Sequence, residues 1–485
     1  MPMTGSMLLA DLSLIVPELI LAVGAMALLL AGVFIKGEET AARLVSLAAM
    51  ALLILAAGVA VFLAPQGGGT AFFGAFVLDS FSLYAKAVVY LAAAIALVLA
   101  GHYLRTERLA RFEFPVLILL ATLGMSVMVS AGDLIALYLG LELQSLALYI
   151  LAAFNRDSLR ASEAGLKYFV LGALSSGLLL YGASLVYGFA GSTEFGAIAL
   201  AAENPSVGLI FGLVFVVSGL AFKISAAPFH MWTPDVYEGA PTPVAAFFAT
   251  APKLAAMVLL IRVLMEPFGA MSDQWQQITI ILAILSMGIG SLGALLQTNI
   301  KRLMAYSSIG NMGYALVGLS AASEAAVWAV LLYMTLYVIG VAGAFGVILS
   351  MRRAEGMVER IEDLAGLSKS RPGLALAFTG LLLSIGGMPF LVGFFGKLFV
   401  FYAAVQAGLV WLVVLAGIFS TVSIAYYLMI LKRVWFDEPT GGEFLNPPAS
   451  VAVITRVTGI ATVGLLLLVP FMLNRVIEAG SAIGG

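Results

Sequence analysis

The segment SGLAFKISAAPFHMW, residues 218–232, places Lys223 inside an apolar helical run, five residues before Pro228. Proline removes a backbone donor and clashes with the carbonyl four residues earlier, so a helix break is predicted here. The motif ISAAPF, residues 224–229, is echoed by IGGMPF, residues 385–390, which predicts a second broken helix. Irregular backbone inside a membrane is tolerated only where it is buried in protein or lines a water-filled cavity. The two breaks therefore predict a polar interior.

The rest of the chain has the composition of a membrane protein. Of its 485 residues 62% are hydrophobic and 10% charged, whereas soluble domains have about 25% charged residues. Fourteen apolar stretches are long enough to cross about 30 Å of hydrocarbon as helices. They begin near residues 12, 42, 80, 112, 132, 161, 206, 240, 274, 302, 324, 372, 408 and 451. The sequence thus predicts an all-α integral membrane protein with about 14 transmembrane helices.

The orientation follows from the basic residues in the connections. Seventeen Lys and Arg residues fall in the odd-numbered connections, and only Arg262 and Arg475 on the opposite side. Because cytoplasmic loops are enriched in Lys and Arg, the odd connections are predicted to be cytoplasmic and both termini to face outward.

Five lysines and a glutamate remain inside the predicted spans: Lys86, Lys167, Lys223, Lys253, Lys397 and Glu142. A charge at the bilayer centre costs about 2.5 to 3.5 kcal/mol, so such residues are functional candidates by default. Lysine can release a proton when buried, whereas arginine stays charged. Five lysines and no arginine in the span interiors therefore indicate proton handling.

Three of the candidates have an alternative, structural interpretation. Lys86 lies in the first turns of its helix, where its side chain is expected to extend to the membrane surface. Lys167 could extend to the surface in the same way. His230 follows the predicted break and is either a proton relay or a polar group facing water.

Nothing in the sequence predicts a cofactor or metal bound by this chain. It has no cysteine and two histidines, which excludes thiolate-ligated iron–sulfur clusters and a histidine-rich metal or haem site. The stretch GIGSLG, residues 288–293, matches a dinucleotide-binding pattern, but it lies in an apolar span without a preceding strand. Close helix packing by small residues is the predicted role of that stretch.

The two echoed motifs also suggest an internal duplication. They lie five predicted helices apart, and an odd spacing turns the second copy upside down, as in transporters with inverted repeats. The alternative is that two proline-broken helices resemble each other by chance.

Three stretches resemble the antiporter-like subunits of respiratory complex I and the related Mrp-type cation/proton antiporters. They are GLAFKISAAPFHMWTPDVYEGAPTPVAAFFATAPKLA at 219–255, NIKRLMAYSSIGNMGY at 299–314 and GGMPFLVGFFGKLFVF at 386–401. The resemblance implies two inverted five-helix repeats, helices 4–8 and 9–13, with helices 7 and 12 broken. The implied division is 1–111 for the first three helices, 112–265 and 266–436 for the repeats, and 437–485 for helix 14.

The resemblance also implies roles for single residues. Glu142 matches the family's helix 5 glutamate, Lys223 its partner on helix 7, Lys253 the central helix 8 lysine and Lys397 the helix 12 lysine. Lys167 matches a helix 6 lysine and His230 the histidine after the break. Lys86 has no such counterpart, so Lys86→Ala is expected to leave turnover unchanged.

The function implied is proton translocation by a non-redox subunit of NADH:quinone oxidoreductase in the bacterial inner membrane, with both termini periplasmic. FMN, iron–sulfur clusters and quinone are then expected in other subunits. The expected partners are the lipid bilayer and membrane subunits such as M, K and J, with no nucleic acid. Two alternatives stay open: a stand-alone or Mrp-type sodium/proton antiporter, and a scaffold that only anchors other subunits.

Overall fold

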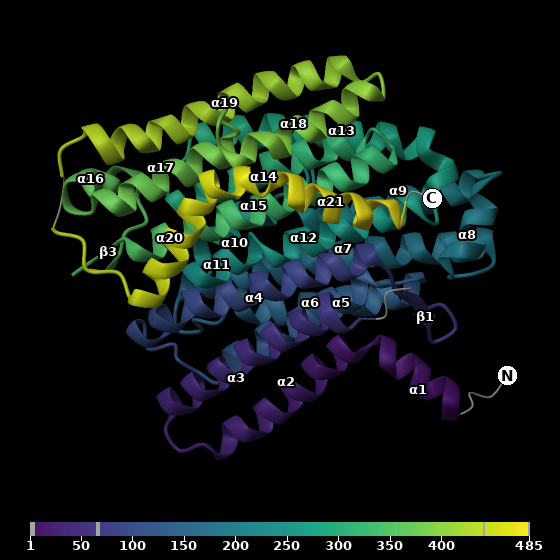
Figure 1. Ribbon diagram of the computed structural model, residues 1–485, viewed down its shortest axis with the longest axis horizontal. Helices are drawn as coiled ribbons and strands as arrows, with labels where there is room; N and C mark the ends of the chain where they lie inside the picture. Colours follow the sequence, from purple (N-terminus) through teal and green to yellow (C-terminus); the bar gives the residue numbers. More distant parts are fainter. Residues whose placement is uncertain (1–4, 65–67, 355, 440–441, 484–485) are drawn as a thin grey trace.

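Long helices run side by side through the molecule, and α1 and α21 reach the same end of it (Figure 1). The computed structural model describes residues 5–64, 68–354, 356–439 and 442–483. The helices of the first half are α1 (Gly5–Leu14), α2 (Val16–Phe34), α3 (Glu38–Gly58), α4 (Ser80–Thr106), α5 (Glu113–Val129), α6 (Leu134–Ala152), α7 (Leu159–Ala190), α8 (Phe195–Ala202), α9 (Val207–Ile224), α10 (Trp232–Gly239), α11 (Thr242–Phe248) and α12 (Ala251–Met265).

The second half contains α13 (Ser272–Leu295), α14 (Ile300–Leu319), α15 (Glu324–Ser350), α16 (Leu367–Ser370), α17 (Pro372–Gly386), α18 (Val392–Gln406), α19 (Val410–Phe436), α20 (Ala449–Gly464) and α21 (Val469–Ser481). Short helical turns lie at Val59–Leu63, Gly269–Met271, Ile361–Leu364 and Leu465–Leu467. Two antiparallel hairpins were not predicted: β1 (Gly69–Ala71) with β2 (Phe76–Leu78), and β3 (Arg352–Arg353) with β4 (Gly356–Met357).

The predicted fold class is confirmed. Within the described ranges, eleven helical segments are long and apolar enough to cross a membrane, and α5, α17 and α18 are shorter apolar helices. The count of about 14 spans stays a prediction. The predicted divisions after residues 111, 265 and 436 fall between α4 and α5, between α12 and α13, and after α19, while the inverted-repeat organisation also stays a prediction.

Both predicted helix breaks are present. α9 ends at Ile224, where Ser225 adopts a left-handed conformation with φ of 60°, and the chain becomes helical again at Trp232. α17 ends at Gly386, where Gly387 has φ of 85°, and α18 begins at Val392. Glycine adopts this conformation at no steric cost, which explains its place at the end of α17.

A third break was not predicted. The eighth predicted span is divided into α11 and α12 at Ala249 and Thr250. Pro252 lies in the first turn of α12, directly before Lys253. A proline fits the first turn of a helix and disfavours helical geometry in the residue before it, so Pro252 was the signal in the sequence.

The span formed by α11 and α12 lies at the centre of the bundle, entirely buried by other helices. α2, α3, α7, α19 and α20 instead leave most of their residues unburied and expose large apolar side chains, as lipid-facing helices do. Lys253, on α12, therefore lies deeper in the protein than the other predicted site residues.

Helix packing by small residues is confirmed in the stretch GIGSLG. A Cβ added to Gly290 on α13 would overlap the backbone nitrogen of Gly310 on α14. The glycine therefore permits the two backbones to approach each other, as small residues do between membrane helices.

Candidate functional site

Lys223 and Glu142, predicted to be partners, are not in direct contact. Lys223 lies in the last turn of α9, and its Nζ donates a hydrogen bond of 2.7 Å to Ser145 Oγ on α6. Glu142, one turn earlier on α6, accepts a hydrogen bond from Ser176 on α7. Among the described residues no ion pair within 4.0 Å joins Glu142 to Lys223. Ser145 lies one helical turn beyond Glu142, on the same face of α6, and its hydroxyl donates to the carbonyl of Leu141 on the same helix.

Tyr149 is a further polar group at this position. Its ring centroid lies 5.9 Å from Lys223 Nζ. The buried Tyr149 hydroxyl has no hydrogen-bond partner in the part of the chain that the structure describes. Buried hydroxyls are normally satisfied, so this oxygen is a place for an ordered water.

Lys253 uses the carbonyl released by the first break. Its side chain is 1% exposed, and its Nζ donates a hydrogen bond of 2.9 Å to the carbonyl of Ile224, the last residue of α9. The ring of Trp232 lies below the ammonium at 5.5 Å. A cation at a helix C-terminus is stabilised by the unpaired carbonyls there.

Lys397 repeats this arrangement at the second predicted break. Its Nζ donates to the carbonyl of Gly386, the last residue of α17, at 2.8 Å, and to Ser420 Oγ on α19 at 3.1 Å. The ring of Tyr314 on α14 lies 4.2 Å away. Each break therefore presents one helix-terminal carbonyl to one buried lysine.

Lys223 lies beside the first break but does not bond to a carbonyl released there in the part of the chain that the structure describes. Ile224 offers its carbonyl to Lys253, and Lys223 turns to Ser145 instead. The reason is helix geometry, because a side chain in the last turn points back along its own helix while the terminal carbonyls point forward.

Lys167 lies apart from these three lysines, whereas His230 lies close enough to Lys253 to be affected by its charge. Lys167 has a side chain 43% exposed and pairs with Glu163 and Asp235, each at 2.8 Å. His230 is half-buried in the segment after the first break, and its Nδ1 is buried without a hydrogen-bond partner in the described residues. The structure therefore agrees with the alternative interpretation of Lys167, in which its side chain reaches the surface. A relay role for His230 stays a prediction.

Lys167 belongs to a charged cluster that joins α7, α10, α14 and the loop after β4. Its members are Arg160, Glu163, Lys167, Asp235, Glu238, Lys301, Arg302 and Glu359. Glu359 in the loop contacts Lys301 at 2.7 Å and Arg160 at 3.0 Å. Burial raises the pKa of Glu359, but the ion pairs with Lys301 and Arg160 together outweigh it and hold the pKa below its ordinary value.

We expect Glu359→Gln to lower the stability of the complex by about 2 kcal/mol at neutral pH, between the values for exposed and buried pairs. Because the pKa of Glu359 is lower in the folded state, its stabilisation is complete above the unfolded pKa of about 4.3 and is lost as the pH falls through the folded pKa. The difference in melting temperature between wild type and variant should therefore shrink once the pH falls below about 4.3 and disappear below the folded pKa. Glu362→Gln is the control, since among the described residues Glu362 forms an ion pair only with the exposed Arg360; a difference independent of pH would contradict the prediction.

The expectation that Lys86 extends to the membrane surface is wrong. Lys86 is 0% exposed, and its Nζ lies 2.8 Å from Glu18 Oε1 on α2, with the ring of Phe76 at 4.5 Å. The same Glu18 oxygen accepts from Ser126 on α5. A lysine inside a closed helix bundle has no path to the interface, so it is paired with a carboxylate from a neighbouring helix.

A hydroxyl network in the second half was not predicted. Tyr337 donates to Ser308 at 2.9 Å, and Tyr333 donates to Asn311 at 2.7 Å. The hydroxyls of Ser307 and Tyr427 lie 2.5 Å apart. The signal was present in AYSSIGNMGY, residues 305–314, which carries polar residues through an otherwise apolar helix.

A small void lies inside this network, next to the second break. It has a volume of about 10 Å³ and is lined by Asn311, Tyr333, Tyr337, Ser384 and three further residues. This is about the space that one water molecule needs, and the polar groups supply its hydrogen-bond partners.

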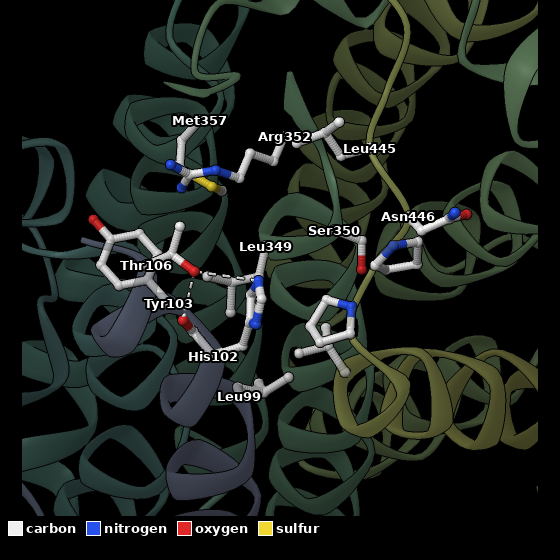
Figure 2. Close-up of a pocket in the computed structure, with 13 residues that line it drawn as sticks. Leu99, His102, Tyr103, Thr106, Leu349, Ser350, Arg352, Met357, Leu445 and Asn446 are labelled. Carbon is white, nitrogen blue, oxygen red and sulfur yellow. Dashed lines mark hydrogen bonds between the residues drawn. The ribbon is translucent and has the colours of Figure 1, made fainter. Parts of the chain in front are cut away.

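A larger cavity of about 320 Å³ lies at the C-terminal end of α4, and Figure 2 shows its lining. His102 and Thr106 project into it from α4, with Ser350, Arg352 and Asn446 opposite. None of the six predicted site residues lines this cavity, so it lies outside the predicted proton-transfer residues.

Replacing Ser145 by alanine is expected to reduce coupled turnover by about tenfold, since a hydrogen bond to a charged group is worth about 1.5 kcal/mol. The change removes the hydroxyl that holds Lys223 without removing either charge. Ser218→Ala is a matched control, because Ser218 lies on the exposed face of α9 and bonds only to Val214 of its own helix. NADH oxidation by membrane vesicles measures the effect, and equal rates for the two variants would contradict it.

Comparison with known proteins places the chain in a family. Residues 131–423 match the family described as NADH:quinone oxidoreductase/Mrp antiporter, TM. NADH-quinone oxidoreductase subunit N of Maricaulis maris is 62% identical over 482 residues, which cover 99% of this chain and 100% of the relative.

Solved structures agree. A chain of respiratory complex I from Thermus thermophilus with bound aureothin is 35% identical, with a TM-score of 0.82, and the match covers 97% of this chain and 100% of that one. A chain of the Mrp complex from Dietzia sp. DQ12-45-1b has a TM-score of 0.85 at 23% identity, over 96% and 97% of the two chains, which shows a shared fold.

A second relative, NADH-quinone oxidoreductase subunit N of Parvibaculum lavamentivorans, is 55% identical over 449 residues, which cover 92% of each chain. The chain belongs to the NADH:quinone oxidoreductase/Mrp antiporter transmembrane family and, within it, to the subunit N group.

Proposed function

We propose that the chain translocates protons across the bacterial inner membrane as a non-redox subunit of NADH:quinone oxidoreductase. Quinone reduction in other subunits supplies the energy. The residues that carry the proton are Glu142, Lys223, Lys253 and Lys397.

One observation carries this proposal: the three buried lysines are held by neutral oxygens. Their partners are the hydroxyls of Ser145 and Ser420 and the carbonyls of Ile224 and Gly386. In the described residues none of the three lysines has a carboxylate within 4.0 Å. A lysine held in this way can lose its proton without leaving a buried carboxylate unpaired, in contrast to Lys86.

The first step proposed is a change in the distance between Glu142 and Lys223. At an effective dielectric of about 20, a carboxylate 4 Å from the ammonium attracts it by about 4 kcal/mol and keeps it charged. When Glu142 is turned toward Ser176, as in the structure, this attraction is weaker and Lys223 releases its proton more readily. The equilibrium between the two positions is thus the switch that the rest of the complex would act on.

The proton then passes to Lys253 and on to Lys397. Lys253 is bonded to the carbonyl of the residue that directly follows Lys223, which brings the two lysines to the same break. Beyond Lys253, the hydroxyls of α14 and α15 and a water in the small void beside Asn311 offer hydrogen-bonded steps toward Lys397. His230, at the same break, would relay protons in this segment.

The proposed setting is that of the relatives. The chain would lie against membrane subunits such as M, K and J, with both termini on the periplasmic side, and FMN, iron–sulfur clusters and quinone would be bound elsewhere in the complex. Strand β3, which contains Arg352 and Arg353, and α16 lie at the opposite end of the bundle from α1 and α21 (Figure 1). Because basic residues are enriched on the cytoplasmic side, this supports the proposed orientation.

The experiment that tests the function compares two driving forces in inverted membrane vesicles. NADH with quinone should drive proton uptake, and an imposed sodium gradient without NADH should not. Glu142→Ala, with the complex fully assembled, should lower the NADH-driven signal. Proton movement that depends on sodium and not on NADH would instead identify a sodium/proton antiporter, and full activity of the Glu142 variant would favour a scaffold.

A further inference from the structure

A groove runs between α3 and α4, away from the buried lysines. It has a volume of about 380 Å³, and Arg43, Leu47 and Met50 line it from one face of α3. Leu97, Val98, Gly101 and Arg105 line it from α4. The two helices lie next to each other, with α3 on the side toward the edge of the bundle (Figure 1). Leu44 and Leu47 of α3 are half-exposed, so the groove opens toward the surrounding bilayer.

One end of the groove is basic. Arg43, Arg105 and Arg111 converge there, with Glu39 at the exposed rim. Arg111 forms an ion pair with Glu38. Arg43 and Arg105 have no carboxylate within 4.0 Å in the described residues, and Arg105 satisfies only its Nε, by donating to the carbonyl of Gly101 at 3.1 Å. Two guanidinium groups thus face the groove with donors to spare.

The other end is apolar. Leu47 and Met50 on α3 face Leu97 and Val98 on α4. From Arg43 to Met50 the helix rises about 10 Å at 1.5 Å per residue. Leu47 is also 50% exposed, as is Leu44 at 49%, so the apolar end continues into the lipid-facing surface of α3. A ligand that fits this groove has a negatively charged head followed by about 10 Å of hydrocarbon chain.

We propose that this groove binds one acidic phospholipid of the surrounding bilayer, with its phosphate between Arg43 and Arg105 and an acyl chain along Leu47 and Met50. Arginine binds phosphate with two parallel hydrogen bonds, and basic pockets between membrane helices at the cytoplasmic face select acidic headgroups. The end with Arg43 and Arg105 is the predicted cytoplasmic end, where such headgroups lie. The proposal is independent of proton translocation.

Gly101 gives the proposal a test that leaves the charges intact. A Cβ added to Gly101 would meet no atom within 4 Å, so the fold tolerates a side chain there. In Gly101→Leu that side chain would occupy the groove. Gly417→Leu on α19 is the matched control, since a Cβ at Gly417 also meets nothing within 4 Å and lies outside the groove.

The experiment reconstitutes the whole complex in phosphatidylcholine vesicles containing a photoactivatable phosphatidylglycerol with the reactive group in its acyl chain. Mass spectrometry then maps the labelled peptides. Label is expected in residues 38–58 and 80–106 and should be displaced by unlabelled phosphatidylglycerol but not by phosphatidylcholine. Labelling should fall about fivefold for each arginine replaced in Arg43→Gln and Arg105→Gln, and should disappear in Gly101→Leu but not in Gly417→Leu.

Four outcomes would overturn the proposal. Equal labelling by a photoactivatable phosphatidylcholine would show that the arginines select nothing. Displacement by soluble glycerol phosphate would identify a free-phosphate site. Undiminished labelling in both arginine variants and in Gly101→Leu would place the lipid elsewhere, and label on a neighbouring subunit at this position would show that protein fills the groove.

Discussion

Replacing Lys253 by methionine is expected to lower NADH-driven proton uptake to less than about a tenth of the wild-type rate. A positioned proton-transfer group contributes about 10²- to 10⁴-fold to a reaction that depends on it. Lys253 is less exposed than Lys223 and Lys397, and no other ammonium contacts the Ile224 carbonyl at the end of α9 in the described part of the chain. Methionine keeps most of the volume and the flexibility of the side chain and removes the proton-carrying ammonium together with its hydrogen bond to Ile224.

The matched control for this variant is Lys432→Met. Lys432 lies near the end of α19 with a side chain 65% exposed and contacts Asp437 at 3.4 Å. Proton uptake by vesicles with equal amounts of assembled complex should be unaffected by the control. A Lys253→Met complex that pumps at the wild-type rate would remove Lys253 from the pathway.

The second large effect concerns stability. Lys86→Ala is expected to destabilise the helix bundle by about 3 to 5 kcal/mol, because it leaves the buried carboxylate of Glu18 without its partner. The expectation from the sequence that turnover is unchanged stays a prediction for whatever complex assembles. The amount of assembled complex in the membrane and its melting temperature measure the loss.

The double variant Glu18→Gln with Lys86→Met separates pairing from function. It removes both charges, so most of the stability should return if the pair only holds α2 against α4 and α5. Lys36→Ala, at a solvated connection between α2 and α3, is the control. Normal assembly of Lys86→Ala alone would contradict the structural role.

The breaks and the buried lysines could be predicted from the sequence because local chemistry determines them. Pro228 and Pro389 each mark a helix break whatever surrounds them, and a lysine deep in an apolar run is recognisable at once. Pro252 is the same kind of signal for the third break, but it lies outside the repeated motif from which the other two breaks were predicted.

The partners of those lysines could not be predicted, because distant parts of the chain supply them. Ser145 lies 78 residues from Lys223, and Ile224 lies 29 residues from Lys253. Whether a lysine such as Lys86 reaches water or a carboxylate depends on which helices surround it, and periodicity does not contain that information. Lys167 shows the converse, since its helix position resembled a buried one and its side chain lies half-exposed among carboxylates.

The most direct test of the central claim is NADH-driven quinone reduction, with the accompanying proton uptake, in vesicles carrying Lys223→Ala beside wild type at equal assembly of the complex. If the buried lysines form an obligatory pathway, electron transfer and proton uptake fall together. If neither changes, Lys223 is structural or serves an independent transport activity, and the proposed pathway is wrong.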